Sequence, residues 1–239
     1  MALSRASIDE PMRVRLAPLD PIKGDPEALL VHEIYASIQG ESTFAGMPCV
    51  FVRTTACHLR CRYCDTEHSF HEGRVRKVDE LIEEVVALGI PLVELTGGEP
   101  LLQKGAFTLV TRLCDRGVRV LVETSGGVST KSLDPRAVCI LDVKTPGSGE
   151  VESNVWSNLD HVRPTDEVKF VLTSRADYEW MRELIGRTRL SERCTVLAGV
   201  AFGEIDNRDL VRWILQDRLG VRFQLQLHKH VWPPHERGV

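Results

Sequence analysis

Short apolar runs alternate with amphipathic segments along most of this chain of 239 residues. The apolar runs, rich in Val, Ile, Leu and Phe, predict strands at residues 29–35, 49–55, 92–95, 118–122, 138–143, 167–172, 195–200 and 222–227. Helical spacing of apolar residues predicts helices at residues 79–88, 106–115, 176–187 and 209–219. Because parallel strands need such crossovers, we expect an α/β fold with a largely parallel sheet, packed as an open or closed barrel.

Polar, glycine-rich segments directly follow several of these strands. Thr96-Gly97-Gly98-Glu99-Pro100 follows one strand, Glu123 to Gly127 follows the next, and Lys144 to Gly147 follows a third. The carboxyl ends of parallel strands meet at one edge of a sheet, where ligands collect. The sequence therefore predicts one shared binding site.

Three of the seven cysteines, Cys57, Cys61 and Cys64, form a C-x3-C-x2-C run directly after a predicted strand. A chain of this length buries roughly 70–75% of its unfolded surface, so it needs no metal or disulfide to hold a core. One interpretation of the run is a zinc site completed by His58, His68 or His71. The other is an iron–sulfur cluster in which one iron lacks a protein ligand, an open position of the kind that catalytic metals keep.

The cysteine run, with Asp65 and Thr66 after it, resembles the signature of the radical S-adenosylmethionine (SAM) superfamily. This resemblance implies a partial, open parallel β/α barrel and a 4Fe-4S cluster on the three cysteines. It also implies that SAM binds the free iron through its amino and carboxylate groups. An electron from the cluster then cleaves SAM to a 5′-deoxyadenosyl radical.

The same resemblance implies SAM contacts from several loops. Gly97-Gly98-Glu99-Pro100 resembles the motif that holds the methionine amino group, and Gly98 would let the cofactor approach the backbone. Tyr63 would present its backbone to the adenine. The implied SAM-binding residues are Tyr63, Cys64, Asp65, Gly98, Glu123, Ser125, Asp142, Val143 and Lys144.

Within the superfamily, the chain resembles the 7-carboxy-7-deazaguanine synthases of queuosine and deazapurine biosynthesis. The resemblance rests on the Gln39-Gly40-Glu41 segment, on Arg53 four residues before the first cysteine, on Cys64-Asp65-Thr66, and on Gln226-Leu227-His228-Lys229. It implies that the substrate is bound by Ile38, Gln39, Gly40, Arg53 and Thr96.

Two of these implied roles have a clear chemical basis. The planar guanidinium of Arg53 can hold a substrate carboxylate with two hydrogen bonds. Thr66 matches the family's Mg²⁺ ligand, and a hydroxyl oxygen suits a hard cation.

The reaction implied by the resemblance converts 6-carboxy-5,6,7,8-tetrahydropterin to 7-carboxy-7-deazaguanine. The deoxyadenosyl radical abstracts hydrogen from C6, the ring contracts, ammonia is lost and SAM is regenerated. Since the cofactor carries this chemistry, no side-chain nucleophile is expected. The resemblance further implies an electron donor such as flavodoxin or ferredoxin, and a homodimer.

The chain departs from the family pattern at three places. Ser42 stands where a glycine is common, and Ala56-Cys57-His58 stands where Gly-Cys-Asn is common, but neither change removes a cluster ligand. Gly199 to Phe202 replaces a Ser-Pro or Gln-Pro pair at a strand exit. Cofactor contacts are therefore not carried over to that segment.

Composition excludes several classes of protein. The 30 Lys and Arg residues are interleaved with 34 Asp and Glu residues, so no nucleic-acid partner is expected. No apolar run is long enough for a signal peptide or a membrane span, which predicts a cytoplasmic protein with reduced cysteines. The cysteines outside the run, at positions 49, 114, 139 and 194, are expected to be core thiols.

Residues 1–28, rich in proline and acidic residues, are expected to form an irregular tail before a single radical SAM domain at 29–239. Two other functions remain open from sequence. A radical SAM activating enzyme would act on a partner protein, but it would leave Arg53 and Gln39-Gly40-Glu41 without a purpose. A zinc-stabilised interaction module would have no catalytic activity.

Overall fold

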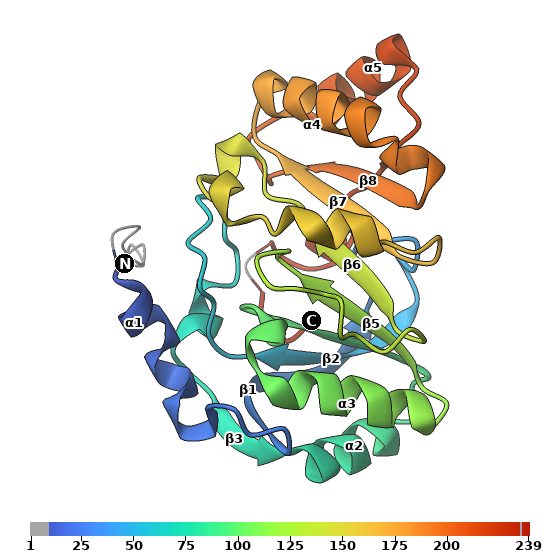
Figure 1. The fold of residues 1–239 in the computed structure, drawn as a ribbon. Coiled ribbons are helices and arrows are strands. Elements are labelled where there is room, and N and C mark those ends of the chain that lie inside the picture. Colours follow the sequence, from blue (N-terminus) through green and yellow to red (C-terminus); the bar gives the residue numbers. More distant parts are fainter. Residues whose placement is uncertain (1–9, 235) are drawn as a thin grey trace.

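The computed structural model of the protein describes residues 10–234 and 236–239. Within them nine strands form one sheet in the order β3-β1-β2-β4-β5-β6-β7-β8-β9, with helices over its outer face (Figure 1). Because β3 and β9 end the sheet without pairing to each other, the predicted open, partial β/α barrel is confirmed. The strands are β1 (Ala28–Ile38), β2 (Pro48–Thr54), β3 (Arg74–Lys77), β4 (Leu92–Gly97), β5 (Arg119–Thr124), β6 (Val138–Asp142), β7 (Glu167–Leu172), β8 (Thr195–Val200) and β9 (Arg222–Phe223).

Strands β2 and β4 to β9 run parallel to one another. Four helices near their predicted positions supply most of the crossovers: α2 (Val78–Ala87), α3 (Lys104–Asp115), α4 (Arg175–Thr188) and α5 (Asn207–Asp217). The shorter connections contain the 3-10 helices η2 (Glu67–Phe70), η3 (Pro100–Leu102), η4 (Pro146–Ser148), η5 (Val151–Ser153), η6 (Trp156–His161) and η7 (Leu190–Glu192). This connectivity places all the loops after parallel strands at one edge of the sheet.

Strand β1 runs antiparallel to both β2 and β3. No apolar alternation marks β3 in the sequence, because three of its four residues are Lys or Arg. Charged side chains suit the edge of a sheet, since they discourage pairing with another chain. The pairing of β1 is also irregular: Val31 lies opposite Thr54 and Glu33 opposite Arg53, so His32 is an extra residue that forms a β-bulge.

Apolar side chains fill both faces of the sheet in different ways. On the outer face, one cluster packs α2 and α3 against β1, β2, β4 and β5, and another packs α4 and α5 against β6, β7 and β8. On the inner face, a smaller cluster contains Cys49, Phe51, Leu92, Leu121 and Ile140. Because side chains alternate along a strand, the inner residues that follow it toward the carboxyl edge are polar: Arg53, Glu94, Glu123 and Asp142. The interior of the barrel is therefore apolar toward the amino ends of the parallel strands, which form its floor, and charged toward their carboxyl ends.

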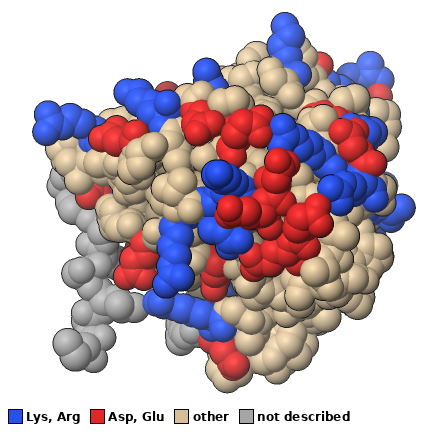
Figure 2. Space-filling model, turned by 90° about the horizontal axis from the view of Figure 1, so that it is seen from below, with Lys and Arg blue, Asp and Glu red and all other residues tan. Residues whose placement is uncertain are grey.

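The outward faces of α2 and α3 carry interleaved acidic and basic side chains. Figure 2, seen from below the view of Figure 1, shows both signs of charge mixed on one face. Ion pairs there join Arg76 to Glu84 at 2.7 Å and Arg116 to Glu83 at 2.9 Å. Such exposed pairs contribute little stability, and this face has no single sign of charge.

The described part of the N-terminal segment contains short helices where an irregular tail is expected. Residues 1–9 of that expected tail lie outside the described residues. Beyond them the chain forms α1 (Met12–Leu16) and the 3-10 helix η1 (Ala17–Ile22). The guanidinium of Arg15 donates to the His58 carbonyl at 2.7 Å, and Arg60 donates to Glu10 at 3.2 Å. This segment therefore packs against the loop that carries the cysteine run.

The predicted strand at 222–227 is wrong beyond Phe223, and the chain ends in the short helix α6 (His228–Val231). The Leu227 N–H donates to the Gly40 carbonyl at 2.7 Å instead of to a strand of the sheet. The side chains of Gln224 and Gln226 donate to Glu41, each at 3.0 Å. Strand β9 therefore ends at Phe223, because the residues after it form hydrogen bonds with the segment after β1. Across the described residues no helix has the length and apolar character to cross a membrane.

The buried side chain of Gln103 gives a test of how β1 is held. Its Oε1 accepts from the Leu30 N–H at 2.8 Å, and its Nε2 donates to the Thr55 carbonyl at 3.0 Å. Substituting Gln103→Leu leaves these buried backbone groups without partners, at a cost of about 1–3 kcal/mol for each. Urea unfolding should show this loss relative to the exposed control Gln216→Leu; equal stability of the two variants would contradict it.

Candidate active site

The loop between β2 and η2 brings together the three cysteines of the run. It begins with a sharp turn, in which Ala56 adopts the left-handed conformation at φ 76°. Cys57 is buried, and Cys61 and Cys64 are half-buried, all in one cluster with Phe70. The expected cluster ligands therefore lie at one place at the carboxyl edge of the sheet.

The spread of the three sulfur atoms bears on the kind of metal they could hold. In the described part of the chain, the three cysteine sulfurs do not all lie within 4.8 Å of one another, whereas ligand atoms of His32, Glu33 and His68 do. A tetrahedral ion bound at about 2.3 Å to each sulfur would hold them about 3.8 Å apart. A wider spread suits a cluster of several irons better than one zinc ion. His68, a candidate fourth zinc ligand in the sequence, faces Glu33 instead.

Burial keeps the three thiols protonated when no metal is bound. It raises the pKa of Cys57 to about 12 and that of Cys61 to about 11, and it also raises the pKa of Cys64. Since the thiolate is the form that binds metal, cluster assembly must release these protons. The remaining cysteines are free thiols packed against the apolar clusters of the sheet: Cys49, Cys114, Cys139 and Cys194.

The paired glycines after β4 fix the start of the cysteine loop. A Cβ on Gly98 would lie 2.1 Å from the Ala56 carbonyl oxygen, so only glycine allows the two loops to approach this closely. The Gly98 N–H donates to the Thr54 carbonyl at 3.2 Å, and the Glu99 N–H donates to the Ala56 carbonyl at 2.9 Å. The glycine thus serves loop packing in the structure, where the sequence suggested cofactor approach.

Glu99 joins the loop after β4 to the loop after β5. This buried carboxylate accepts from the Thr124 hydroxyl at 2.9 Å, from the Ser125 N–H at 2.7 Å and from the Ser125 hydroxyl. It also accepts from the Leu101 N–H at 3.0 Å. Ser125, expected to contact SAM, is therefore held in position by Glu99.

The exit of β6 gathers Asp142 and Lys144 beside Tyr63 of the cysteine loop. The Lys144 ammonium donates to Asp142 at 2.8 Å and lies 5.9 Å from the centre of the Tyr63 ring. The Tyr63 hydroxyl and Asp142 Oδ1 are buried without a hydrogen-bond partner. Val143, also expected at the SAM site, uses its N–H in the sheet, where it donates to the Lys169 carbonyl at 2.9 Å. Two buried polar atoms therefore face the region where a polar ligand would satisfy them.

Arg53 is held on the inner face of β2 by two side chains of β1. Its Nε donates to Glu33 at 2.9 Å, and its Nη2 donates to the Tyr35 hydroxyl at 2.8 Å. The guanidinium is thereby fixed in orientation at the carboxyl edge of the sheet. The ion pair also contributes to lowering the pKa of Glu33 to about 2, after the larger effect of His68.

A row of polar side chains crosses the inner face of the sheet from Arg53. Arg53 lies opposite Thr96 in the pairing of β2 with β4, and the Thr96 hydroxyl donates to Glu123 at 2.9 Å. Glu123 also accepts from Lys169 on β7, whose ammonium donates to Glu41 at 2.9 Å. Although burial by itself would raise the pKa of Glu123, Lys169 lowers it to about 2. The row therefore contains an ion pair inside the barrel that is charged at neutral pH.

The segment after β1 contains the other expected substrate residues. Ile38 ends β1 opposite Pro48, and the Gln39 side chain donates to the buried carboxyl of Glu94. Burial, followed by the nearby Glu123 carboxylate, raises the pKa of Glu94 well above its usual range. A Cβ on Gly40 would lie 2.0 Å from Nδ1 of His228, so glycine allows the C-terminal segment to pack here. Burial of Glu94 within the candidate site therefore favours the protonated form of its carboxyl group more than water would.

Asp65 and Thr66 follow the last cysteine of the loop. Asp65 accepts from the Lys229 ammonium at 2.7 Å, which joins the cysteine loop to α6. The Thr66 hydroxyl lies 3.8 Å from the Cys64 sulfur, while its carbonyl accepts from the Ser69 N–H at 2.9 Å. The hydroxyl is therefore the group of Thr66 that could bind a cation.

The loop after β8, where the chain departs from the family pattern, borders a cavity that none of the expected site residues lines. A cavity of about 290 Å³ there is lined by Phe202, Gln224, Gln226 and His230, among others. Phe202 is 53% exposed, and the Lys229 ammonium lies 5.3 Å from the centre of its ring. This loop lies close to α6 through Lys229, whose ammonium also pairs with Asp65 of the cysteine loop.

Sequence analysis gave no role to Glu94 and Lys169 and named Glu99 only as part of the glycine motif, yet all three ionisable residues organise the site. Two of them carried a detectable signal, because Glu94 and Lys169 each interrupt an apolar run that predicts a buried strand. A charged residue in such a run is almost never fully buried unless it is paired. Their partners could not be read from the sequence, since they lie on other strands.

The family model for the radical SAM superfamily matches residues 51–142 of the chain. The chain is also 45% identical to the 7-carboxy-7-deazaguanine synthase of Chlorobaculum tepidum, over 88% of this chain and 97% of that protein. It is 44% identical to the 7-carboxy-7-deazaguanine synthase of Koribacter versatilis, over 87% of this chain and 99% of that protein.

Two solved structures share the fold. The crystal structure of QueE from Escherichia coli matches with a TM-score of 0.69 and 19% identity, over 85% of this chain and 95% of that chain. Streptococcus suis SuiB bound to S-adenosylmethionine matches with a TM-score of 0.53 and 16% identity, over 70% of this chain and 47% of that chain. At these identities the likeness concerns the fold alone.

The buried pair of Lys169 and Glu123 predicts a pH-dependent stability. Because the pKa of Glu123 is about 2 in the folded chain and about 4.3 in an unfolded one, its stabilising effect is present above about pH 4.3 and disappears as the pH falls toward 2. Lys169→Met leaves Glu123 buried without its cation and should cost about 3–5 kcal/mol at neutral pH. The difference from wild type should shrink as the pH falls and Glu123 protonates.

Urea unfolding of cluster-free protein at pH 7 and at pH 4 measures this difference. The exposed Lys131→Met variant is the control for loss of one positive charge. A deficit of Lys169→Met that stays the same at both pH values would show that the pair does not control the ionisation of Glu123.

Proposed function

The chain belongs to the 7-carboxy-7-deazaguanine synthase family of radical SAM enzymes, and we propose that its substrate is 6-carboxy-5,6,7,8-tetrahydropterin. The reaction is that of a radical SAM lyase, in which the pterin ring contracts to the deazaguanine and ammonia is lost. The observation that carries the proposal is the row formed by Arg53, Thr96 and Glu123 on the inner face of the barrel. It places a cation, a hydroxyl and a carboxylate beside the cysteine loop. These groups match the carboxylate and the polar ring edge of the pterin.

Family membership implies a 4Fe-4S cluster and SAM, and the cysteine loop fits that cluster. Cys57, Cys61 and Cys64 would hold it, because the three cysteines gather in one loop and in one cluster with Phe70, and thiolates are the ligands of such clusters. When bound, the reduced cluster and SAM supply the 5′-deoxyadenosyl radical that takes hydrogen from the substrate. A zinc-stabilised module without catalysis is excluded by membership of an enzyme family.

SAM is proposed to bind along the loops after β2, β4, β5 and β6. The contacting residues would be Tyr63, Cys64, Asp65, Gly98, Glu123, Ser125, Asp142, Val143 and Lys144. The unpartnered Tyr63 hydroxyl and Asp142 Oδ1 support this placement, because a polar ligand would satisfy them. Ser125 and Glu123 are already oriented by Glu99 and Lys169, so these two side chains need no rearrangement to receive a ligand.

The pterin is proposed to lie between β1 and β5, bound by Ile38, Gln39, Gly40, Arg53 and Thr96. Arg53 would hold the substrate carboxylate, since Glu33 and Tyr35 fix the orientation of its guanidinium. The Gln39 amide and the Glu94 carboxyl, which are hydrogen-bonded to each other, would together offer hydrogen-bonding groups to the edge of a heterocycle. The apolar floor beneath them would exclude water from the reacting ring.

Several further features belong to the proposal. Mg²⁺ would bind the Thr66 hydroxyl together with the substrate carboxylate and water. An electron donor such as flavodoxin or ferredoxin would reduce the cluster, and two copies of the chain would form a homodimer. Residues 29–239 would make up one catalytic domain of a cytoplasmic enzyme, with no nucleic-acid partner.

Product formation tests the proposed substrate directly. Anaerobically reconstituted protein is incubated with carboxytetrahydropterin, SAM, dithionite and Mg²⁺, and the products are separated by chromatography. We expect 7-carboxy-7-deazaguanine and ammonia over many turnovers per molecule of SAM. Stoichiometric 5′-deoxyadenosine without deazaguanine would refute the substrate while leaving the family assignment intact.

The substitution Arg53→Lys tests the carboxylate contact. A lysine keeps the charge but cannot form two parallel hydrogen bonds, so we expect KM for the pterin to rise about tenfold, which corresponds to about 1.4 kcal/mol. The exposed Arg74→Lys variant is the matched control. An unchanged KM in Arg53→Lys would mean that Arg53 has only a structural role.

The substitution Thr66→Ala tests the proposed Mg²⁺ ligand. It removes one oxygen ligand and leaves all three cysteines in the chain, so half-maximal activity should need more Mg²⁺ while the iron content stays the same. Activity is measured as a function of Mg²⁺ concentration in wild type and variant. Identical Mg²⁺ curves would remove Thr66 from the metal site.

A further inference from the structure

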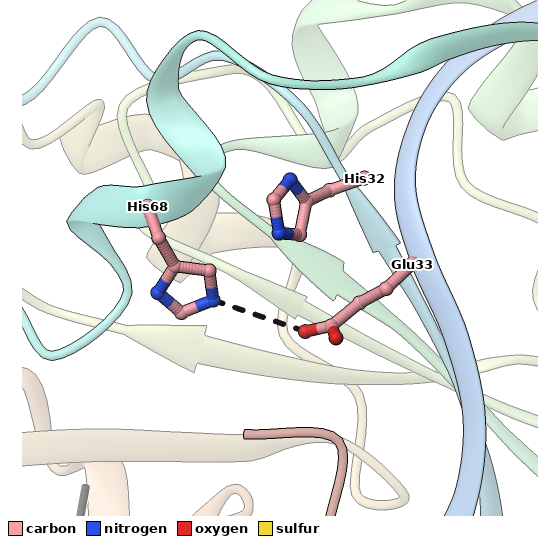
Figure 3. Close-up of side chains that lie close together, drawn as sticks. All are labelled: His32, Glu33 and His68. Atoms are coloured by element: carbon pink, nitrogen blue, oxygen red, sulfur yellow. Dashed lines mark ion pairs between the residues drawn. The ribbon is translucent and has the colours of Figure 1, made fainter. Parts of the chain in front are cut away.

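A second group of potential metal ligands includes Glu33, the partner of Arg53 in its ion pair. His32 and Glu33 of β1 and His68 of η2 point toward one another, as Figure 3 shows. Their ligand atoms all lie within 4.8 Å of one another, and His68 Nε2 is 3.8 Å from Glu33 Oε1. The set contains none of the residues that hold the iron–sulfur cluster.

The β-bulge in β1 explains how two adjacent residues share this site. Neighbouring side chains on a regular strand point to opposite faces of the sheet. His32 is the extra residue of the bulge, which lets its ring and the Glu33 carboxylate both turn toward His68. A regular strand would have separated them.

Two of the three ligands already have the partners that metal ligands usually have. Metal-binding histidines commonly use their second ring nitrogen to bond a backbone carbonyl, and His32 Nδ1 lies 2.8 Å from the Glu72 carbonyl oxygen. That contact leaves Nε2 of His32 for a metal. Ligating carboxylates are themselves hydrogen-bonded, and Glu33 Oε1 accepts from Arg53 Nε at 2.9 Å.

The third potential ligand, His68, has a ring nitrogen that lacks a hydrogen-bond partner. Nε2 of His68 is buried and has no hydrogen-bond partner. An unpaired buried polar atom costs free energy, and a metal ion would satisfy it. The 3.8 Å gap between this atom and Glu33 Oε1 is too long for a hydrogen bond, and it is within about 0.5 Å of the roughly 3.3 Å that separates nitrogen and oxygen ligands on a tetrahedral ion.

We propose that His32, Glu33 and His68 bind a divalent transition metal ion at a site separate from the iron–sulfur cluster. Two imidazoles and one carboxylate suit zinc and its first-row neighbours, whereas magnesium and calcium prefer oxygen ligands throughout. Three protein ligands leave at least one position for water. The ion would clamp the bulge of β1 to η2, the turn directly after Thr66, and would hold Glu33 against Arg53.

This inference stands apart from the proposed substrate, because it concerns metal binding outside the reacting groups. The first measurement uses cluster-loaded protein and Zn²⁺ as the probe. Equilibrium dialysis followed by metal analysis counts zinc per chain, while iron content and visible absorption report that the cluster is intact. Wild type should bind one Zn²⁺ that is weakened at least about 10–100-fold in His32→Ala and in His68→Ala, the loss known for outer partners of metal sites.

The exposed His71→Ala variant on the same loop is the matched control and should bind zinc like wild type. Equal zinc binding by wild type, His32→Ala and His68→Ala would overturn the proposal. If either variant fails to fold, X-ray absorption at the zinc edge of wild type decides the matter without a substitution. Nitrogen and oxygen neighbours at about 2.0–2.1 Å would support the site, and sulfur at about 2.3 Å would overturn it.

Discussion

Lys169 places an ammonium group between the carboxylates of Glu41 and Glu123 inside the barrel. A buried charge is costly unless it is paired, so the three residues must come together when the sheet folds around them. The two ion pairs of Lys169 link β7 to β5 and to the segment after β1. Glu41 in turn accepts from Gln224 and Gln226, so the same group holds the C-terminal segment. The inner face of the barrel is thus organised by one cation.

The loops at the carboxyl edge are fixed to one another before any ligand binds. Glu99 fastens the loop after β4 to the loop after β5, and Gly98 packs directly on the start of the cysteine loop. Glu33 and Tyr35 hold Arg53 in the same way. Side chains that are already oriented lose little freedom on binding, which favours a reaction that needs close alignment of cofactor and substrate. The second metal site proposed on Glu33 would extend this bracing to η2.

The repeated strands and helices could be predicted because their apolar periods are local. The run Thr195–Val200 and the helical spacing in Asn207–Asp217 needed no knowledge of their neighbours. Strand β3 could not be predicted, since its basic residues form a strand only because β1 offers an edge. The predicted strand beyond Phe223 was wrong for the same reason, as the Leu227 N–H bonds to Gly40 and not to a strand of the sheet.

The sequence by itself determined the chemistry that this protein carries. The spacing of Cys57, Cys61 and Cys64 and the glycines after the next strand mark the family, because metal ligation and close backbone approach depend on residue type at fixed local positions. The tertiary structure alone decided which charges meet inside the barrel and how His32, Glu33 and His68 come together. Glu41 and Lys169 are 128 residues apart in the chain. Such pairs depend on strand order and on one bulge, which arise only when the whole sheet forms.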